Sequence, residues 1–380
     1  MKRLENYISI FVTLFCVAYL GWDLVPKRAS HEFETGVFGS LPVLLNGRLK
    51  PIDTVARNAL LIIHGKRTFK FEDGENKRTM PAVEWLLEVV YDAPAANGRK
   101  VFLIHNQDVL SLIGAKKDDG KLYSYAELTE HTDEILRQAV LADAVEAQLR
   151  TPFQQHAIKL QNQLALYQKL QHSLQHPGAT EVAGDLQEFM RVVEPGIEAS
   201  TKRDRGEPYD EEAFETMTRL AAGFIAQAGH GFFFPVPPAD PSAGVDGWRK
   251  VGDAMMMAAD EGGLPPAATA YADMGDAFRA RDPSAFLESG NVFAKWLQKN
   301  HGATARKAGY EAFFNAFSPF YKSMVFYVLA FLLACFFWLS GSNPLCRAAM
   351  VPLFVALAIH VFGLVSRMVI EGRPPVTNLY

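Results

Sequence analysis

Three long apolar runs mark the two ends of the chain, and most charged residues lie between them. The first run covers about residues 7–25 and has ISIFVTLFCVAYLGW at its heart. A helix needs about 20 apolar residues to cross a bilayer. A cleaved signal peptide is the alternative, but no A-x-A-like site is obvious near the end of the run, and Trp22 lies where an interfacial aromatic residue would. We therefore expect an uncleaved N-terminal membrane anchor.

The second and third runs lie close together near the C-terminus. The second covers 319–340 and carries aromatic residues at both ends, as at the two faces of a bilayer. Gly341-Ser342-Asn343-Pro344 then breaks the helix, and the third run covers about 347–370. We expect Ser318 to cap the second helix. Buried core helices are the alternative, but two such runs joined by about six residues favour a membrane hairpin.

Basic residues give a weak orientation signal, because Lys2 and Arg3 before the first run are opposed by Lys27 and Arg28 after it. With the N-terminus inside, the central region and the C-terminus lie outside. The predicted fold class is mainly α, with three transmembrane helices and a large, mostly helical extracytoplasmic domain between the first and second. The predicted domains are an N-terminal membrane anchor at 1–29, the extracytoplasmic domain at 30–317, and a transmembrane hairpin at 318–380.

Helical periodicity dominates the central region. Asn46-Gly47 predicts a turn. Apolar residues at helical spacing predict a helix from Asp53, acting as its cap, to Gly65. A second helix is expected over 81–91, with Thr79 as a candidate cap.

Further along, residues 101–104 suggest a short strand and 108–114 a short helix. Residues 125–175 predict two long amphipathic helices packed as a hairpin. We expect 177–210 to be a loop and 267–299 to be helical.

Composition and charge narrow the class of function. The chain has 38 Lys and Arg against 42 Asp and Glu, so its net charge of −4 gives no support to nucleic-acid binding. The cysteines, Cys16, Cys335 and Cys346, lie in or beside apolar runs and offer no disulfide framework. His172 and His176 are four residues apart without further ligands at suitable spacing, so no metal site is expected. No phosphate loop, GxSxG or HExxH motif is present, and the central region offers no catalytic centre.

Ionisable residues on the third run are the strongest candidates for function. His360, Arg367 and Glu371 are spaced by seven and four residues, so they lie within roughly 40° of one another around a helix. Arg367 and Glu371 can pair at i, i+4, and Gly363 near the same face permits close approach of another group. The two charged residues could instead extend to the interface. His360 is deeper, and it is either a packing histidine or a haem ligand or proton-transfer group.

The sequence after this histidine resembles a known family. ALAIHVFGLVSRMVIEGRPPVTNLY is similar to the signature region of CcsA/ResC-type cytochrome c biogenesis proteins, in which a histidine and an arginine precede G-R-P-P-x-T-N-L-Y. The matching residues are His360, Arg367, Gly372, Arg373, Pro374, Pro375, Thr377, Asn378, Leu379 and Tyr380. Two upstream segments, NGRLKPIDTVARNALLIIHGK and YEAFFNAFSPFYKSMVFY, resemble parts of fused ResB/CcsA-like proteins.

The resemblance implies a membrane component of cytochrome c maturation in the bacterial inner (plasma) membrane, handling haem for attachment to apocytochrome c outside. The implied partners are apocytochrome c, the lipid bilayer, and further CcsA-like helices or a ResB-like subunit. His360 is the candidate haem ligand. The Trp-rich haem loop of the family does not occur in these residues, so we expect either an N-terminal portion of a haem-attachment synthase or one half of a split one, with no catalytic centre of its own. The alternative is a membrane-tethered extracytoplasmic sensor or scaffold without catalytic activity.

Overall fold

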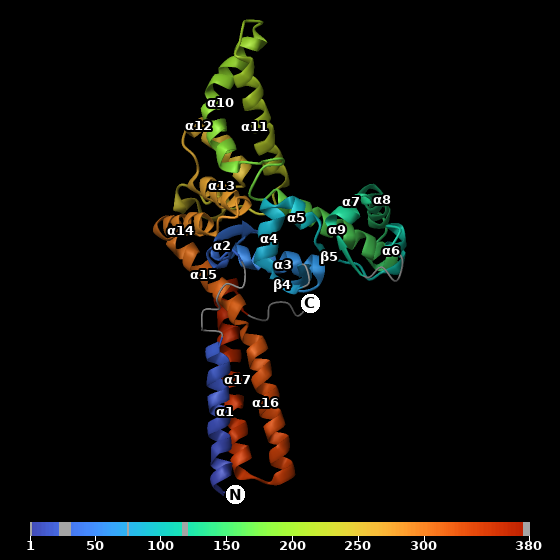
Figure 1. Ribbon diagram of the computed structural model, residues 1–380, viewed down its shortest axis with the longest axis vertical. Coiled ribbons are helices and arrows are strands. Elements are labelled where there is room, and N and C mark those ends of the chain that lie inside the picture. The colour runs from blue at the N-terminus through green and yellow to red at the C-terminus, as the bar shows by residue number, and fades with distance from the viewer. Residues whose placement is uncertain (1, 23–31, 74–75, 116–120, 375–380) are drawn as a thin grey trace. The chain divides into compact units, whose positions relative to one another are not determined.

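The computed structural model describes residues 2–22, 32–73, 76–115 and 121–374, and it is mainly helical. The chain forms two compact units (Figure 1). Residues 1–32 and 309–380 form the terminal unit, and residues 33–308 form the central unit. The boundary between them falls inside helix α15 (Gly302–Phe317).

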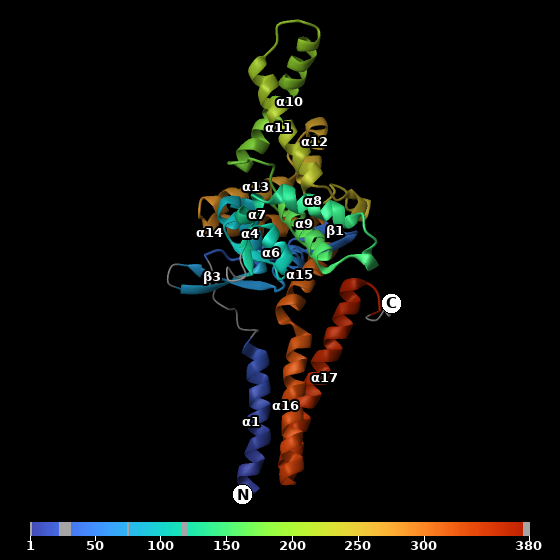
Figure 2. The ribbon, with the colours of Figure 1, turned by 90° about the vertical axis from the view of Figure 1, so that its right-hand side faces the viewer.

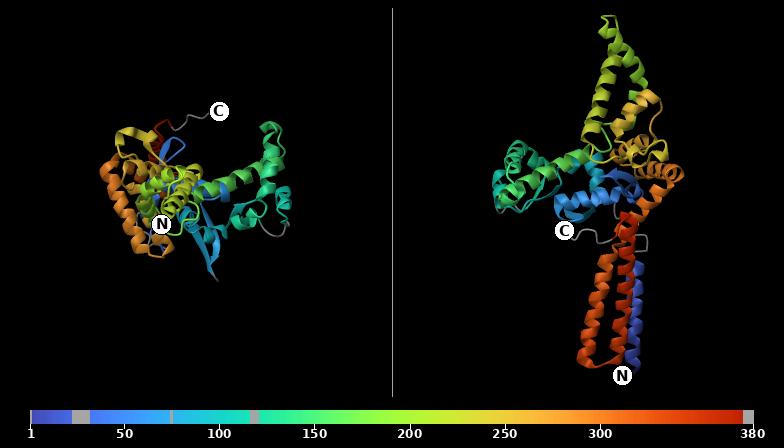
Figure 3. Two further views of the ribbon diagram at one scale, coloured as in Figure 1. Left: turned by 90° about the horizontal axis from the view of Figure 1, so that it is seen from above. Right: turned by 180° about the vertical axis from the view of Figure 1, so that it is seen from behind.

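The terminal unit is built on three long helices, which are α1 (Lys2–Trp22), α16 (Pro319–Ser340) and α17 (Asn343–Glu371). In the view of Figure 1, α17 lies beside both α1 and α16, and it runs parallel to α1 and antiparallel to α16. The rear view in Figure 3 shows the same order. A small core joins the helices, including Val12 and Cys16 of α1, Phe326 of α16 and Ala356 of α17.

Two helices of this unit are long and apolar enough to cross a membrane, namely the continuous stretch 302–340 and α17. Only 17% and 28% of their most apolar stretches are buried, whereas the core helix of a water-soluble domain is mostly buried. Among the described residues, α1 contributes a shorter apolar stretch, Ile10–Gly21. Two of the three predicted spans therefore qualify by length and composition, the described part of α1 does not, and the membrane arrangement itself stays a prediction.

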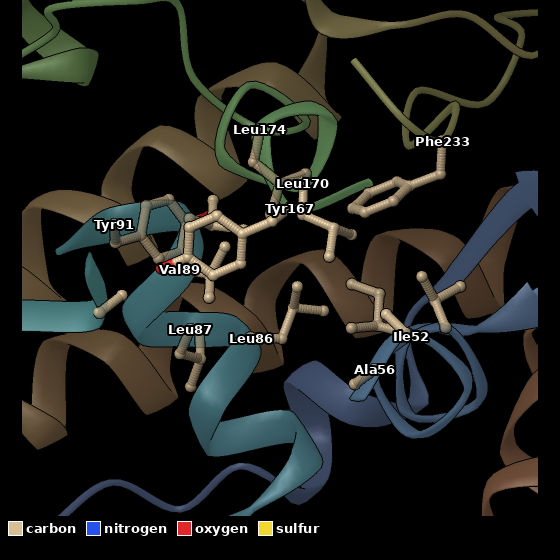
Figure 4. Packing of buried hydrophobic residues seen from close by; sticks show 14 of the residues in the cluster. Ile52, Ala56, Leu86, Leu87, Val89, Tyr91, Tyr167, Leu170, Leu174 and Phe233 are labelled. Carbon is tan, nitrogen blue, oxygen red and sulfur yellow. The ribbon is translucent and has the colours of Figure 1, made fainter. Parts of the chain in front are cut away.

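The central unit is organised around α3 (Ile52–His64), α4 (Ala82–Tyr91) and α9 (Pro152–Gln171). Figure 4 shows Ile52 and Ala56 of α3, Leu86 of α4 and Tyr167 of α9 pointing into one apolar core. The strands β1 (Pro42–Leu45) and β2 (Arg48–Pro51) form a hairpin that leads directly into α3. Its turn has positive φ at Asn46 (53°) and Gly47 (70°), so the predicted Asn-Gly turn is confirmed.

Shorter elements surround this core. Two further antiparallel hairpins join β3 (Thr68–Asp73) to β4 (Asn76–Pro81) and β5 (Lys100–Leu103) to β6 (Leu122–Ser124). The predicted strand over 101–104 is thus largely confirmed. The small helices are α2 (Gly36–Ser40), α5 (Ala93–Asn97), α6 (Gln107–Leu112), α7 (Tyr125–Thr129) and the 3-10 helix η1 (Ala147–Leu149).

Pairs of longer helices complete the central unit. The expected hairpin within 125–175 is formed by α8 (Thr132–Asp143) and α9. Figure 2 shows α10 (Val182–Asp204) and α11 (Glu211–His230) as an antiparallel pair, with α12 (Val251–Glu261) alongside. The 3-10 helix η2 (Pro241–Gly247) precedes α12. The predicted helix over 267–299 is divided into α13 (Pro266–Arg279) and α14 (Pro283–Asn300).

The loop predicted over 177–210 is wrong, because most of it is helix α10. Leu186, Phe189 and Val193 recur at helical spacing and are buried. The surrounding charged residues and Pro195 obscured this pattern, although the helix continues through the proline. Gly196 brings α10 close to α11, since a Cβ there would lie 2.6 Å from the Cβ of Met217.

The structure also corrects the predicted helix caps. Helix α3 begins at Ile52, so Asp53 lies inside its first turn and its carboxylate accepts from Arg57 Nε at 2.8 Å. Thr79 lies in β4 opposite Lys70 and does not cap α4. Ser318 adopts a left-handed conformation, and its hydroxyl donates to the carbonyl of Asn315 at 2.9 Å instead of capping α16.

Candidate functional site

The candidate site lies on α17, whose packed side is lined mainly by small residues. The buried positions recur at intervals of three and four and include Pro352, Ala356, Ile359, Gly363, Ser366 and Ile370. Small residues let helices approach closely where the surrounding solvent gives no hydrophobic drive. A Cβ at Gly363 would lie 3.0 Å from Cε1 of Phe320, so this glycine admits the phenyl ring of α16. The close approach expected at Gly363 is thus present.

His360 lies near the middle of α17, beside this row of buried residues, which we call the packed seam. It is eleven residues before Glu371, about 16 Å along the helix at 1.5 Å per residue. Two rings of α16 meet its imidazole edge-on, with centroid distances of 5.8 Å to Phe320 and 6.0 Å to Tyr327. The side chain is partly exposed, and its ring nitrogens make no hydrogen bond to any part of the chain that the structure describes. Two aromatic rings thus support the imidazole, and within the described residues its nitrogens stay available.

About one and a half turns further along α17, Ser366 is another buried residue of the packed seam. Its side chain is 1% exposed, and its oxygen lies 2.6 Å from the hydroxyl oxygen of Tyr310 in α15. A buried hydroxyl needs such a partner because desolvation without a hydrogen bond is costly. Sequence reasoning missed this pair, since the two residues are 56 positions apart.

Three charged residues gather at the C-terminal end of α17. Arg367 Nη2 lies 3.7 Å from Glu371 Oε1, and Arg373 Nη2 lies 3.8 Å from Glu371 Oε2. The i, i+4 pair expected between Arg367 and Glu371 is therefore formed. Both guanidinium side chains are more than half exposed, so the cluster carries a net positive charge at an accessible surface.

The G-R-P-P part of the family-like motif begins where α17 ends. Gly372 adopts a left-handed conformation (φ 69°), and its N–H donates to the carbonyl of Met368 at 2.8 Å. Arg373 and Pro374 follow in the described chain. Pro375, Thr377, Asn378, Leu379 and Tyr380 lie outside the described residues.

Two buried charged residues of this unit were missed by sequence reasoning. Glu311 of α15 is 4% exposed and Lys322 of α16 is 3% exposed. Lys322 Nζ lies 3.8 Å from the ring centroid of Phe317, a cation–π contact. The available signal was a lysine inside an otherwise apolar run, which is costly in a membrane unless it is satisfied inside the protein.

The histidines considered in the central unit do not share a helix face, because α9 ends at Gln171. His172 faces His230 with ring centroids 6.3 Å apart, and burial lowers its pKa. His176 Nε2 lies 2.9 Å from Asp185 Oδ2. Within the described ranges, no group of three or more His, Cys, Asp or Glu residues is placed to hold a metal ion.

Comparison with known proteins leaves the family open. No protein-family model matches this sequence, and no curated protein shows significant similarity to it.

Proposed function

We propose that this chain is a membrane component of cytochrome c maturation that handles haem for attachment to apocytochrome c on the outer side of the bacterial plasma membrane. One observation carries the proposal. His360 presents an imidazole without hydrogen-bond partners, among the described residues, midway along an apolar helix. An ionisable residue at that depth usually serves a function.

The surroundings of His360 suit a haem ligand. A neutral imidazole can bind haem iron, and Phe320 and Tyr327 provide apolar edges beside it. Arg367 lies seven residues further along α17, about 10 Å along the helix, where its exposed guanidinium can pair with an acidic haem substituent. Bound haem would supply the vinyl groups that become attached to the cytochrome, while this chain would hold and orient it.

The rest of the architecture is consistent with this role. A hairpin of two apolar helices anchors the chain in lipid, and the motif that follows Glu371 resembles the signature of CcsA/ResC-type proteins. On this proposal, three helices cross the bilayer and the central unit faces outward, where it can meet apocytochrome c. Further CcsA-like helices or a ResB-like subunit would complete the haem site.

Haem titration tests the ligand directly. The full chain is reconstituted in lipid nanodiscs, and haem is added while the Soret absorbance is recorded. Replacing His360→Ala should reduce affinity at least about tenfold, because it removes an iron ligand. His105→Ala is the matched control, since His105 is exposed in the central unit. Added imidazole should restore the Soret band of His360→Ala. Equal spectra for wild type and His360→Ala would reject His360 as the ligand.

Accessibility labelling tests the orientation. Single cysteines are placed at Ser242 in the central unit and at Ser342 in the hairpin turn, in a chain with its native cysteines replaced by serine. A membrane-impermeant maleimide added to intact spheroplasts should label the cysteine at 242 and should label the one at 342 only after permeabilisation. Labelling of both, or the reverse pattern, would contradict an outward-facing central unit.

A further inference from the structure

The central unit contains an apolar cavity with one cationic group at its wall. Its volume is about 540 Å³, which is within the range of sites for small organic ligands. It lies among the segment 236–249, helix α12 and the start of α13, and Trp296 of α14 completes the wall.

Proline and glycine shape this cavity. Pro237 and Pro238 line it from one segment, and Pro265 and Pro266 line it from another. Proline has no N–H, so these walls offer rings and few donors. Gly262 and Gly263 form the turn after α12 with φ of 77° and 88°, conformations that favour glycine.

Trp296 is held in a fixed position. Its ring stacks on Phe293 with an interplanar angle of 18° and a centroid distance of 5.9 Å. His301 contacts it from another direction at 5.6 Å and is itself 7% exposed. Burial lowers the pKa of His301, which keeps this neighbour neutral at pH 7. The positive charge at the cavity therefore comes from another residue.

Among the lining residues whose side chains the structure describes, Arg249 alone is charged. Its backbone pairs with Val236 in both directions, at 3.0 and 2.9 Å, which fixes it beside the proline wall. No carboxylate of the described chain lies within 4 Å of its guanidinium. The residue is exposed, so it stands at the opening with its charge available.

A neighbouring hollow has the opposite charge. It shares Pro266 and Trp296 with the first, but its ionisable lining residues are Asp273 and Glu288. The two hollows, which share Pro266 and Trp296, therefore have described lining side chains of opposite charge. An anion is attracted to the first and repelled by the second.

We propose that the cavity at Arg249 binds an apolar small molecule that carries one carboxylate, of the size of a medium-chain fatty acid. The apolar walls would take the hydrocarbon part, and Arg249 would pair with the carboxylate, a geometry that guanidinium groups favour. This binding is independent of haem handling at α17, because it uses residues of the central unit alone.

Photo-cross-linking tests the proposal on the full chain in nanodiscs. The probe is dodecanoic acid with a terminal diazirine, and labelled peptides are mapped by mass spectrometry, which separates protein binding from partition into lipid. The acid should label peptides containing Met257 or Trp296. Arg249→Gln should lower this labelling about tenfold at subsaturating probe. The methyl ester of the probe should label wild type and Arg249→Gln equally.

Two further variants keep the result decisive. Met257→Trp should block labelling by both acid and ester, because Met257 is an exposed lining residue whose enlargement fills the cavity. Lys299→Gln, at an exposed cation outside the lining, should leave labelling unchanged. Undiminished acid labelling in Arg249→Gln, or labelling confined to peptides outside the cavity, would overturn the proposal.

Discussion

The terminal and central units place large apolar side chains in opposite locations. In the central unit, Trp85 and Tyr271 are fully buried. In the terminal unit, Phe11, Trp338 and Phe354 are 71%, 76% and 61% exposed, while Ala, Gly and Ser line much of the packed seam. Water drives large apolar groups inward, whereas hydrocarbon does not. This contrast is expected if the terminal unit lies in lipid, as we propose, and the central unit in water.

The largest expected effect comes from matched tryptophan truncations. Trp85→Ala in α4 should lower the free energy of unfolding of the central unit by about 4 kcal/mol, because it empties a fully packed position. Trp338→Ala, at the exposed end of α16, should change it by less than about 0.5 kcal/mol. Urea titration of the solubilised chain, followed by pulse proteolysis, measures both. Similar losses in the two variants would break the contrast between the units.

A pair of glycines tests how tightly the central unit is packed. A Cβ at Gly252 of α12 would lie 1.9 Å from the carbonyl oxygen of Phe224, so Gly252→Ala must separate α11 from α12. We expect a loss of about 3 kcal/mol in the same urea titration. Gly229→Ala in α11 meets nothing within 4 Å and should be neutral or stabilising by up to about 1 kcal/mol. A neutral Gly252→Ala would show that these helices are not in close contact.

The contacts of Gln227 show why the close packing of α11 against α12 could not be predicted from the sequence. Its amide donates to the Ser173 carbonyl at 3.0 Å, and its side-chain oxygen accepts from the N–H of Gly252. Gln227 thus joins the residues after α9 to the start of α12 through contacts that are 54 and 25 positions apart in sequence. Periodicity locates helices, but it does not state which distant backbone groups a buried amide will satisfy.

Local patterns were informative where local interactions decide the structure. The Asn46-Gly47 turn and the helix end at Gly65 follow from the left-handed conformations that these residues favour. The spacing of Arg367 and Glu371 was sufficient to predict their pairing. In contrast, the rings beside His360 come from α16, so hairpin packing had to be known before that site could be described.

The central unit also buries a carboxyl group whose ionisation can be followed. Burial raises the pKa of Glu84 from 4.5 to about 7, although Arg78 opposes the shift. The folded state therefore binds this proton more tightly than the unfolded state. Its contribution to stability is complete below pH 4.5 and is lost as pH rises through 7. The full shift corresponds to about 3 kcal/mol, and because solvent screens this partly exposed group we expect a loss of about 2 kcal/mol in urea titrations at successive pH values.

Glu84→Gln isolates that contribution. The neutral amide should remove most of the decline between pH 4.5 and 7 and should make the variant more stable than wild type at pH 8. Glu215→Gln is the control, because Glu215 is exposed on α11. A decline that persists unchanged in Glu84→Gln would assign the titration to another group.

The smallest expected effect lies in the terminal unit, at Gly363. Alanine at an ordinary helix position gains about 1 kcal/mol over glycine, and Gly309→Ala in α15, with no atom within 4 Å, should show that gain in thermal unfolding in nanodiscs. Gly363→Ala should lose it, because its Cβ would meet the Phe320 ring at 3.0 Å and move it by a few tenths of an ångström. Phe320 also contacts His360, so the same shift should weaken haem binding about threefold, whereas Gly309→Ala should leave haem binding unchanged. Equal gains in stability in the two variants would show that α16 and α17 are not in close contact at Gly363. Equal haem binding would show that Phe320 does not support His360 in a haem site.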